Sequence, residues 1–405
     1  MLNLIVFSVD FLPNIGGIST MTHHLANALG ECGCNVLVVS PNKETEFPGY
    51  QRRYKLFNDI DARPRVREGE AYAEEFDRIR GLCAKLHGEK FKFDHAIVSH
   101  PFYYGPGVAG FCLENKIPYS VFCYAFEIKS LLNQRGRSFR LKRALGLVGE
   151  RDSIDDLTFR TYRDASTVFA ISRYSAGLAC SFSLRDRVVI TGCGVSDEDI
   201  ARRPRELPEP ASLERLAGRE RFGIPTNCLV LGTLCRLMPS KNVEMLIRAV
   251  ARNRSAVGVI VGKGPEKEKL LRLASELGCE DRLYWFENVS ETDKWALLAC
   301  MDIFCLLSRE TREGQVEGFG IVLLEAALAG VPVVGTRSGG IPDVIENGVS
   351  GSLVDVDDDE ALDACIEKVA LDDDYAIKLV SNMKRSIEEK FNWKEVSKIV
   401  IDQIS

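Results

Sequence analysis

Two acidic residues, Glu317 and Glu325, stand eight positions apart in "EGFGIVLLEAALAGVPVVGT", residues 317–336. Glycines surround the first carboxylate, and the second lies in an apolar run that predicts a helix ended by Gly330, with Pro332 beyond it. Eight residues of an ideal helix turn by about 80° net, so both carboxylates can address one side. Carboxylates there can accept hydrogen bonds from sugar and ribose hydroxyls. A buried Glu325 paired with an arginine is the structural alternative.

A second candidate group is cationic. Arg236 and Lys241 flank a proline turn in "CRLMPSKN", which follows an expected strand and precedes an amphipathic helix. At the carboxyl end of a strand, two fixed cations can bind a diphosphate and neutralise it as it leaves. Solvated surface charges are the alternative, because most arginines and lysines are exposed.

Two glycine-containing loops follow other expected strands. Gly16 and Gly17, in "LPNIGGIST", precede a helix whose start can hold an anion or an acceptor hydroxyl, although a tight turn alone would also need glycine. Gly262 and Gly264, in "VGKGPEKEKL", lack the third glycine of the dinucleotide fingerprint. The missing fingerprint argues against a dinucleotide oxidoreductase.

Short apolar runs must position these loops. Runs that are apolar on both faces and alternate with segments of helical length predict buried parallel strands, and therefore an α/β protein with doubly wound, Rossmann-like sheets. The expected strands lie within residues 2–8, 34–40, 95–100, 117–125, 166–172, 187–195, 228–236, 257–264, 282–287, 302–308 and 332–336.

The length of 405 residues favours two domains. The charged, proline-containing stretch 199–222 lacks an expected strand and is interpreted as a linker between an N-terminal domain, 1–198, and a C-terminal domain, 223–388. Two such domains place a ligand at the carboxyl ends of their strands, in a central cleft.

The composition excludes some classes of function. A net charge of −6 argues against a nucleic-acid partner bound through bulk charge. We expect a cytoplasmic protein, since no apolar run reaches the roughly 18 residues of a membrane helix and the first residues lack signal-peptide features. The thirteen cysteines lie mostly in apolar stretches and are interpreted as reduced core thiols.

Two charged stretches are interpreted as ordinary structural features rather than as binding sites. Residues 355–360, "DVDDDE", contain a D-x-D spacing but open an expected helix, so we expect no metal there. Residues 133–152 carry arginines among leucines, which indicates a solvated helix face. The alternative for 133–152 is peripheral contact with anionic lipid on the inner face of the plasma membrane.

Taken together, "PNIGGI", "CRLMPSKN", "GKGPEKEKL" and "EGFGIVLLEAALAGVPVVGTRSGGIPDVIENGVSGSLV" resemble the retaining GT-B glycosyltransferases of family 4, glycosyl transferases group 1. The resemblance is strongest from about residue 228 to 356 and is closest to phosphatidylinositol mannosyltransferase-like enzymes. It implies transfer of a hexose, with retention, from a nucleoside diphosphate sugar to a hydroxyl of a sugar, lipid-linked or polyol acceptor, in biosynthesis of cell-envelope glycans. The leaving diphosphate would take the acceptor's proton, without a metal. The final segment, 389–405, would return to the N-terminal domain.

The resemblance also assigns the donor site. It gives Arg236 and Lys241 to the diphosphate, Glu317 to the sugar hydroxyls and Glu325 to the ribose. The remaining donor-binding positions are loop residues that offer backbone N–H groups or border the nucleotide: Gly16, Gly17, Gly262, Gly264, Gly318, Phe319, Gly320 and Ile321.

One position departs from the family pattern. Many relatives carry a histidine near the end of the strand that matches residues 117–125, and here Tyr124 takes that place. Tyrosine can hydrogen-bond a sugar hydroxyl, so Tyr124 joins Glu317, Arg236 and Lys241 as a catalytic candidate. The missing histidine also motivates a non-catalytic nucleotide-sugar-binding relative as an alternative, beside an epimerase or phosphorylase of the same fold.

Overall fold

The computed structural model describes residues 1–11, 17–41, 52–62, 70–129, 154–181, 183, 185–201 and 213–405. These residues form two compact units, of which unit 1 comprises 1–193 and 393–405, and unit 2 comprises 194–392. Gly16 and the basic segment 133–152 lie outside the described residues. None of the described helices combines the length and hydropathy needed to span a bilayer.

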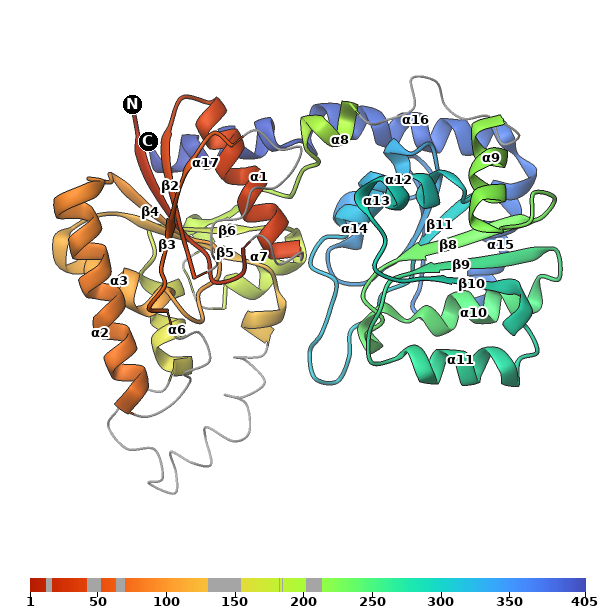
Figure 1. Cartoon of the computed structure of the whole chain (residues 1–405), viewed down its shortest axis with the longest axis horizontal. Helices are drawn as coiled ribbons and strands as arrows, with labels where there is room; N and C mark the ends of the chain where they lie inside the picture. Colours follow the sequence, from red (N-terminus) through yellow and green to blue (C-terminus); the bar gives the residue numbers. More distant parts are fainter. Residues whose placement is uncertain are drawn as a thin grey trace. The chain divides into compact units, whose positions relative to one another are not determined.

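Unit 1 contains a seven-stranded parallel sheet in the order β3-β2-β1-β4-β5-β6-β7 (Figure 1). Its strands are β1 (Asn3–Phe7), β2 (Asn35–Ser40), β3 (Lys55–Asn58), β4 (His95–Val98), β5 (Tyr119–Cys123), β6 (Thr167–Ala170) and β7 (Val188–Ile190). Its α-helices are α1 (Gly17–Glu31), α2 (Glu70–Lys85), α3 (Gly105–Asn115), α6 (Ile154–Asp164), α7 (Arg173–Ala179) and α17 (Trp393–Ile404).

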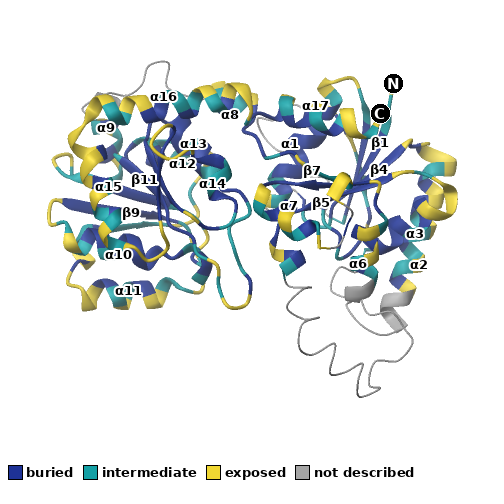
Figure 2. Ribbon diagram, turned by 180° about the vertical axis from the view of Figure 1, so that it is seen from behind, coloured by how far each residue is buried: buried dark blue, intermediate teal, exposed yellow. Residues whose placement is uncertain are grey.

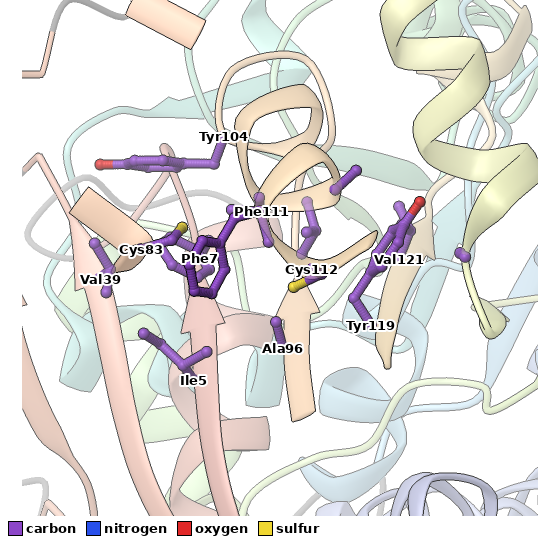
Figure 3. Close-up of a cluster of buried hydrophobic side chains, with 14 of the residues drawn as sticks. Ile5, Phe7, Val39, Cys83, Ala96, Tyr104, Phe111, Cys112, Tyr119 and Val121 are labelled. Atoms are coloured by element: carbon purple, nitrogen blue, oxygen red, sulfur yellow. The ribbon is translucent and has the colours of Figure 1, made fainter. Parts of the chain in front are cut away.

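The core of unit 1 follows from strand alternation. Ile5 and Phe7 point to the face covered by α2 and α3, where they pack with Cys83, Phe111 and other apolar side chains (Figure 3). Leu4 and Val6 alternate with them and are fully buried as well. Both faces of the sheet are therefore covered, as a parallel sheet requires.

Unit 2 repeats the scheme with a six-stranded parallel sheet in the order β10-β9-β8-β11-β12-β13. Its strands are β8 (Leu229–Leu234), β9 (Ala256–Val261), β10 (Leu283–Phe286), β11 (Ile303–Leu306), β12 (Val333–Thr336) and β13 (Ser352–Val354). Its α-helices are α8 (Asp197–Ala201), α9 (Leu213–Phe222), α10 (Val243–Arg252), α11 (Lys267–Glu276), α12 (Glu291–Ala299), α13 (Ile321–Leu328), α14 (Ile341–Val344), α15 (Asp359–Leu371) and α16 (Asp373–Glu389). In both units the central strands are buried and the helices expose their outer faces (Figure 2).

These sheets confirm the predicted α/β class and its two doubly wound, Rossmann-like domains. The structure differs from expectation around the linker, because residues 213–222 form α9, which packs on α12 within unit 2. Arg215 and Arg219 are buried there, and both guanidinium groups form ion pairs with Asp302. The pairing with Asp302 explains how charged residues enter the packed part of the unit.

The last helix belongs to unit 1. Residues of α17 pack along α1, and the Trp393 ring stacks on His24 with ring centroids 5.9 Å apart. The structural boundary falls between residues 392 and 393, whereas the sequence placed the start of this segment at 389.

Candidate functional site

The candidate residues of unit 2 gather where parallel strands end. Their loops follow β8, β9, β11 and β12, and the carboxyl ends of parallel strands share one edge of a sheet. In the sheet, β9 lies on one side of β8, whereas β11 and β12 lie on the other side of β8. The loops after β8 and β11 therefore diverge at the topological switch point, where open α/β sheets bind ligands.

The loop after β8 carries the two candidate cations. Arg236 is exposed, and Lys241 ends a short 3-10 turn, Pro239–Lys241. The Lys241 ammonium forms an ion pair with the Glu317 carboxylate, which comes from the loop after β11. Burial acts to lower the pKa of Lys241, but the charge of Glu317, its hydrogen bond to Lys241 and the nearby Cys235 together raise the pKa, so the ammonium stays charged.

Arg309 holds these two loops together, although it was not among the predicted site residues. Its backbone N–H donates to the Ser240 carbonyl at 2.8 Å, and its Nε donates to the Pro239 carbonyl at 3.2 Å. Its guanidinium also lies 3.3 Å from the Glu244 carboxylate on α10. An arginine in a polar loop resembles any surface charge, so no local pattern predicts these contacts.

Glycines let the site loops approach one another. A Cβ on Gly262 would lie 1.9 Å from the Cys235 carbonyl oxygen, and one on Gly264 would lie 2.2 Å from that of Leu237. On the other side of the site, a Cβ on Gly340 would lie 2.0 Å from the Gly318 carbonyl oxygen. The predicted glycines therefore fix the loop after β9 against the loop after β8, in positions that no larger residue can take.

The second carboxylate of the E-x7-E pair has its own ion pair. Gly320, with φ of +96°, forms the N-cap of α13, and Glu325 lies on that helix. The Glu325 carboxylate lies 3.0 Å from the Lys294 ammonium on α12, which also pairs with Glu291 at 2.8 Å. Burial raises the pKa of Glu325, while Lys294 opposes the shift. The structural alternative named an arginine as the partner of Glu325, whereas the structure shows a lysine.

The other predicted residues of unit 2 make packing contacts, begin a helix or form ion pairs within the unit. Phe319 is buried and contacts Phe391 at a centroid distance of 5.7 Å, while Ile321 begins α13. In the "DVDDDE" stretch, Asp358 accepts a hydrogen bond from the Ala361 N–H at the start of α15, as expected of a helix start. Asp359 pairs with arginines of α10.

Unit 1 places Tyr124 at the carboxyl end of β5, partly buried. Its backbone N–H donates to the buried Glu127 carboxylate at 2.5 Å, and Tyr162 donates to the same oxygen at 3.2 Å. Burial raises the pKa of Glu127. Ala125, between them, has φ of +87°, a strained conformation that persists because these contacts hold the turn. Gly17 begins α1 and is exposed.

A cavity of about 840 Å³ lies elsewhere in unit 2. Leu229, Ile303 and Pro332 line it, and they stand at the amino-terminal ends of β8, β11 and β12. The cavity is therefore at the opposite edge of the sheet from Lys241 and Glu317. We assign the candidate site to the carboxyl edge, where the charged residues and glycines gather.

Two family models match this chain. The model described as "Glycosyl transferases group 1" matches residues 215–389, and the model described as "Glycosyl transferase 4-like domain" matches residues 16–194. Together they span most of the chain. Residues 215–389 belong to the glycosyl transferases group 1 family, and the two matches together support a family 4 glycosyltransferase of the GT-B fold. The predicted resemblance is thereby confirmed.

Curated relatives match part of the chain. A GDP-mannose-dependent alpha-(1-6)-phosphatidylinositol monomannoside mannosyltransferase of Mycolicibacterium smegmatis is 35% identical over 53% of this chain and 55% of its own length. An N-acetyl-alpha-D-glucosaminyl L-malate synthase of Bacillus anthracis is 32% identical over 44% of this chain and 45% of its own. The chain thus spans about half the length of the curated relatives it matches.

Solved structures share the fold over the whole chain. Anabaena HepE, solved in complex with UDP and glucose, superposes with a TM-score of 0.74 at 18% identity, covering 100% of this chain and 99% of its own. Sucrose-phosphate synthase from Thermosynechococcus elongatus gives a TM-score of 0.74 at 17% identity, covering 99% of this chain and 98% of its own. At these identities the likeness describes the fold alone.

Proposed function

We propose that this protein is a retaining glycosyltransferase that moves a hexose from a nucleoside diphosphate sugar to an acceptor hydroxyl. The observation that carries the proposal is the Lys241–Glu317 ion pair, which joins the loops after β8 and β11 at the switch point of unit 2. A cation and a carboxylate side by side suit a donor whose diphosphate is anionic and whose sugar carries hydroxyl donors.

The proposed chemistry needs charge stabilisation more than a protein base. As the bond between the anomeric carbon and the diphosphate oxygen breaks, Arg236 and Lys241 stabilise the negative charge on the leaving diphosphate. The backbone N–H groups of Phe319, Gly320 and Ile321, at the start of α13, can add to this stabilisation. A leaving-group oxygen takes the acceptor's proton on the same face, while the acceptor oxygen bonds the anomeric carbon. We propose that no metal takes part.

Two carboxylates would hold the hexose and the ribose of the donor. Glu317 would accept hydrogen bonds from hexose hydroxyls, and Glu325, fixed by Lys294, would accept from the ribose. Tyr124, which stands at the position of the family histidine, is the further catalytic residue that we propose.

The acceptor class follows from the relatives' names. The Mycolicibacterium enzyme is named for phosphatidylinositol monomannoside, and a 30% identical enzyme of Saccharomonospora viridis is named for D-inositol 3-phosphate. We propose a hydroxyl of a sugar, of a polyol or of a lipid-linked polyol as the acceptor, at the cytoplasmic side of cell-envelope glycan synthesis.

Product analysis tests the proposal. The protein would be incubated in excess chelator with UDP-glucose or GDP-mannose and with inositol 3-phosphate, inositol or a short glycan, and the product's anomeric configuration determined by proton NMR. We expect a glycoside with the donor's configuration, and a nucleoside diphosphate released in equal amount. An inverted product, or activity that appears only with added metal, would contradict the mechanism. Donor binding without any transfer would instead support the non-catalytic alternative.

A further inference from the structure

Two residues of unit 2 with left-handed backbone conformations are joined by a side-chain hydrogen bond. Asn242, with φ of +48°, lies between the Pro239–Lys241 turn and α10, and Asp357, with φ of +60°, lies between β13 and α15. The Asn242 Nδ2 donates to the Asp357 Oδ1 at 3.0 Å. This contact fixes the orientation of the amide, because an ionised carboxylate can only accept a hydrogen bond. Left-handed conformations of residues other than glycine persist where such contacts hold them, and they cluster at functional sites.

Asn242 sets the direction of the chain directly after Lys241. A left-handed residue between two right-handed segments breaks the helix axis, so the 3-10 turn that ends at Lys241 does not continue along the axis of α10. Asn242 is fully buried, and its Oδ1 has no hydrogen-bond partner among the described residues. A buried carbonyl oxygen without a partner costs free energy, so stability alone does not explain an asparagine here.

Asp357 is connected to the same turn a second time, through Arg309. The Asp357 Oδ1 lies 3.9 Å from the Arg309 Nη1, and Arg309 in turn binds the carbonyl groups at the start of the turn Pro239–Lys241. Asp357 is therefore linked to the start of the turn through Arg309 and to its end through Asn242. The Lys241 side chain extends from the end that Asn242 holds.

We propose that Asn242 and Asp357 are positioning residues that hold Lys241 where its ammonium can meet the donor diphosphate. Asp357 belongs to the acidic stretch 355–360, for which sequence analysis expected only a helix start, and it lies 115 positions from Asn242. The inference rests on the proposed function, and it adds two residues that act through Lys241 without touching the ligand.

Glycine substitutions remove the hydrogen bond but keep the backbone conformation. Asn242→Gly and Asp357→Gly each delete one partner, and glycine adopts a positive φ without strain. Asp357→Asn keeps an acceptor oxygen for Asn242 and is the conservative rescue. Asp358→Ala is the matched control, since Asp358 caps the same helix, α15, through the Ala361 N–H. Calorimetric titration with UDP, GDP and ADP is the readout, on proteins whose folding is checked by thermal unfolding.

We expect both glycine variants to bind the nucleoside diphosphate about five- to tenfold more weakly than the wild type does, in line with the loss of one hydrogen bond. Asp357→Asn and Asp358→Ala should bind within about twofold of the wild type. A double-mutant cycle with Lys241→Met separates positioning from general damage. In the Lys241→Met background, Asp357→Gly should have no further effect on affinity, because no ammonium remains to be positioned.

The proposed function and this inference fail in different ways. If no nucleotide binds folded wild type, or if Lys241→Met binds like the wild type, both are wrong. If Lys241→Met weakens binding but the glycine variants bind like the wild type, this inference alone is overturned. The same conclusion follows if Asp357→Gly weakens binding equally with and without Lys241. Asn242→Gly in the same cycle decides the point if Asp357→Gly does not fold.

Discussion

Lys241 and Glu317 lie 76 positions apart in the chain, yet the fold places their charges in contact. Their side chains retain 21% and 15% of their exposure, so the pair is accessible to a ligand rather than sealed in the core. A partly exposed ion pair contributes little to stability, on the order of 1 kcal/mol. Its position at the strand ends therefore indicates a functional role more than a structural one.

Removing one member of this pair tests the assignment. Lys241→Met and Glu317→Gln should each lower kcat/KM by about 100- to 1000-fold, because each removes a group that stabilises developing charge or orients the sugar. Thermal unfolding should change little. Lys269→Met is a matched control, since Lys269 also pairs with glutamates but is 54% exposed on α11. Wild-type turnover in a folded Lys241→Met protein would contradict the assignment.

His23 should make unit 1 sensitive to acid. Burial, aided by the nearby charges of His24 and Arg52, lowers the pKa of His23 from 6.5 to about 3. A depressed histidine pKa stabilises the fold above the unfolded value, and that stabilisation is lost as the pH falls from about 6.5 toward 3. Between pH 6.5 and 4.5 the free energy of unfolding should drop by roughly 2 to 3 kcal/mol from this group.

Urea denaturation of wild type and His23→Gln at both pH values measures that effect. The variant should be less stable at neutral pH, because it disturbs the 2.8 Å hydrogen bond with Tyr54, but it should lose less stability on acidification. Equal losses in the two proteins would show that His23 does not carry the acid sensitivity.

At the scale of elements, the strands that position the site were predicted, whereas two of the four edge strands were missed. The runs 2–8 and 228–236 contain β1 and β8, which are central and apolar on both faces. β3 and β13 each lie at one edge of their sheet, have four and three residues, and were absent from the prediction, whereas the opposite edge strands, β7 and β10, were predicted. A short edge strand pairs on one side only, so its sequence lacks the continuous apolar signal.

In the loops, local sequence predicted several site residues but not the partners that they meet in the folded unit. Local sequence singled out Arg236, Lys241 and Glu317 because glycines and strand ends mark their positions. It gave no indication of Lys294 beside Glu325 or of Arg309 beside Pro239, since such partners meet only in the folded unit. The burial of Arg215 and Arg219 was missed for the same reason, because their partner Asp302 is distant in sequence.

Gly340→Ala tests how closely the loop after β12 supports the loop that carries Glu317. The new Cβ would lie 2.0 Å from the Gly318 carbonyl oxygen, so the backbone next to Glu317 must move. We expect a loss of roughly 2 to 4 kcal/mol in the free energy of unfolding, and at least tenfold weaker donor binding. Gly81→Ala in α2, where nothing lies within 4 Å, should instead stabilise by about 1 kcal/mol. Unchanged donor binding in Gly340→Ala would contradict the proposed support.

At the scale of the whole molecule, the chain crosses from unit 1 to unit 2 near residue 193 and returns at 393. The two units have separate hydrophobic cores, one built on β1 and β4 and the other on β8 and β11. The final helix, α17, therefore contributes to the stability of unit 1 although it follows unit 2 in sequence.

Trp393→Ala should reveal this division. Trp393 is buried against α1, and removing such a ring costs about 3 to 5 kcal/mol. Hydrogen exchange measured by mass spectrometry should show lost protection in α1 and β2, with unit 2 unchanged. Loss of protection spread equally over both units would mean that they do not unfold separately.

The central claim is that unit 2 binds a nucleoside diphosphate sugar through the carboxyl edge of its sheet. Calorimetric titration in chelator, with UDP, GDP and ADP and their glucose and mannose conjugates, tests it most directly. We predict clear binding of one nucleotide and its sugar conjugate to the wild type, and at least tenfold weaker binding to Arg236→Ala, which loses a charge-assisted contact to the diphosphate. No heat from any nucleotide with folded protein, or equal affinity in Arg236→Ala, would contradict the account.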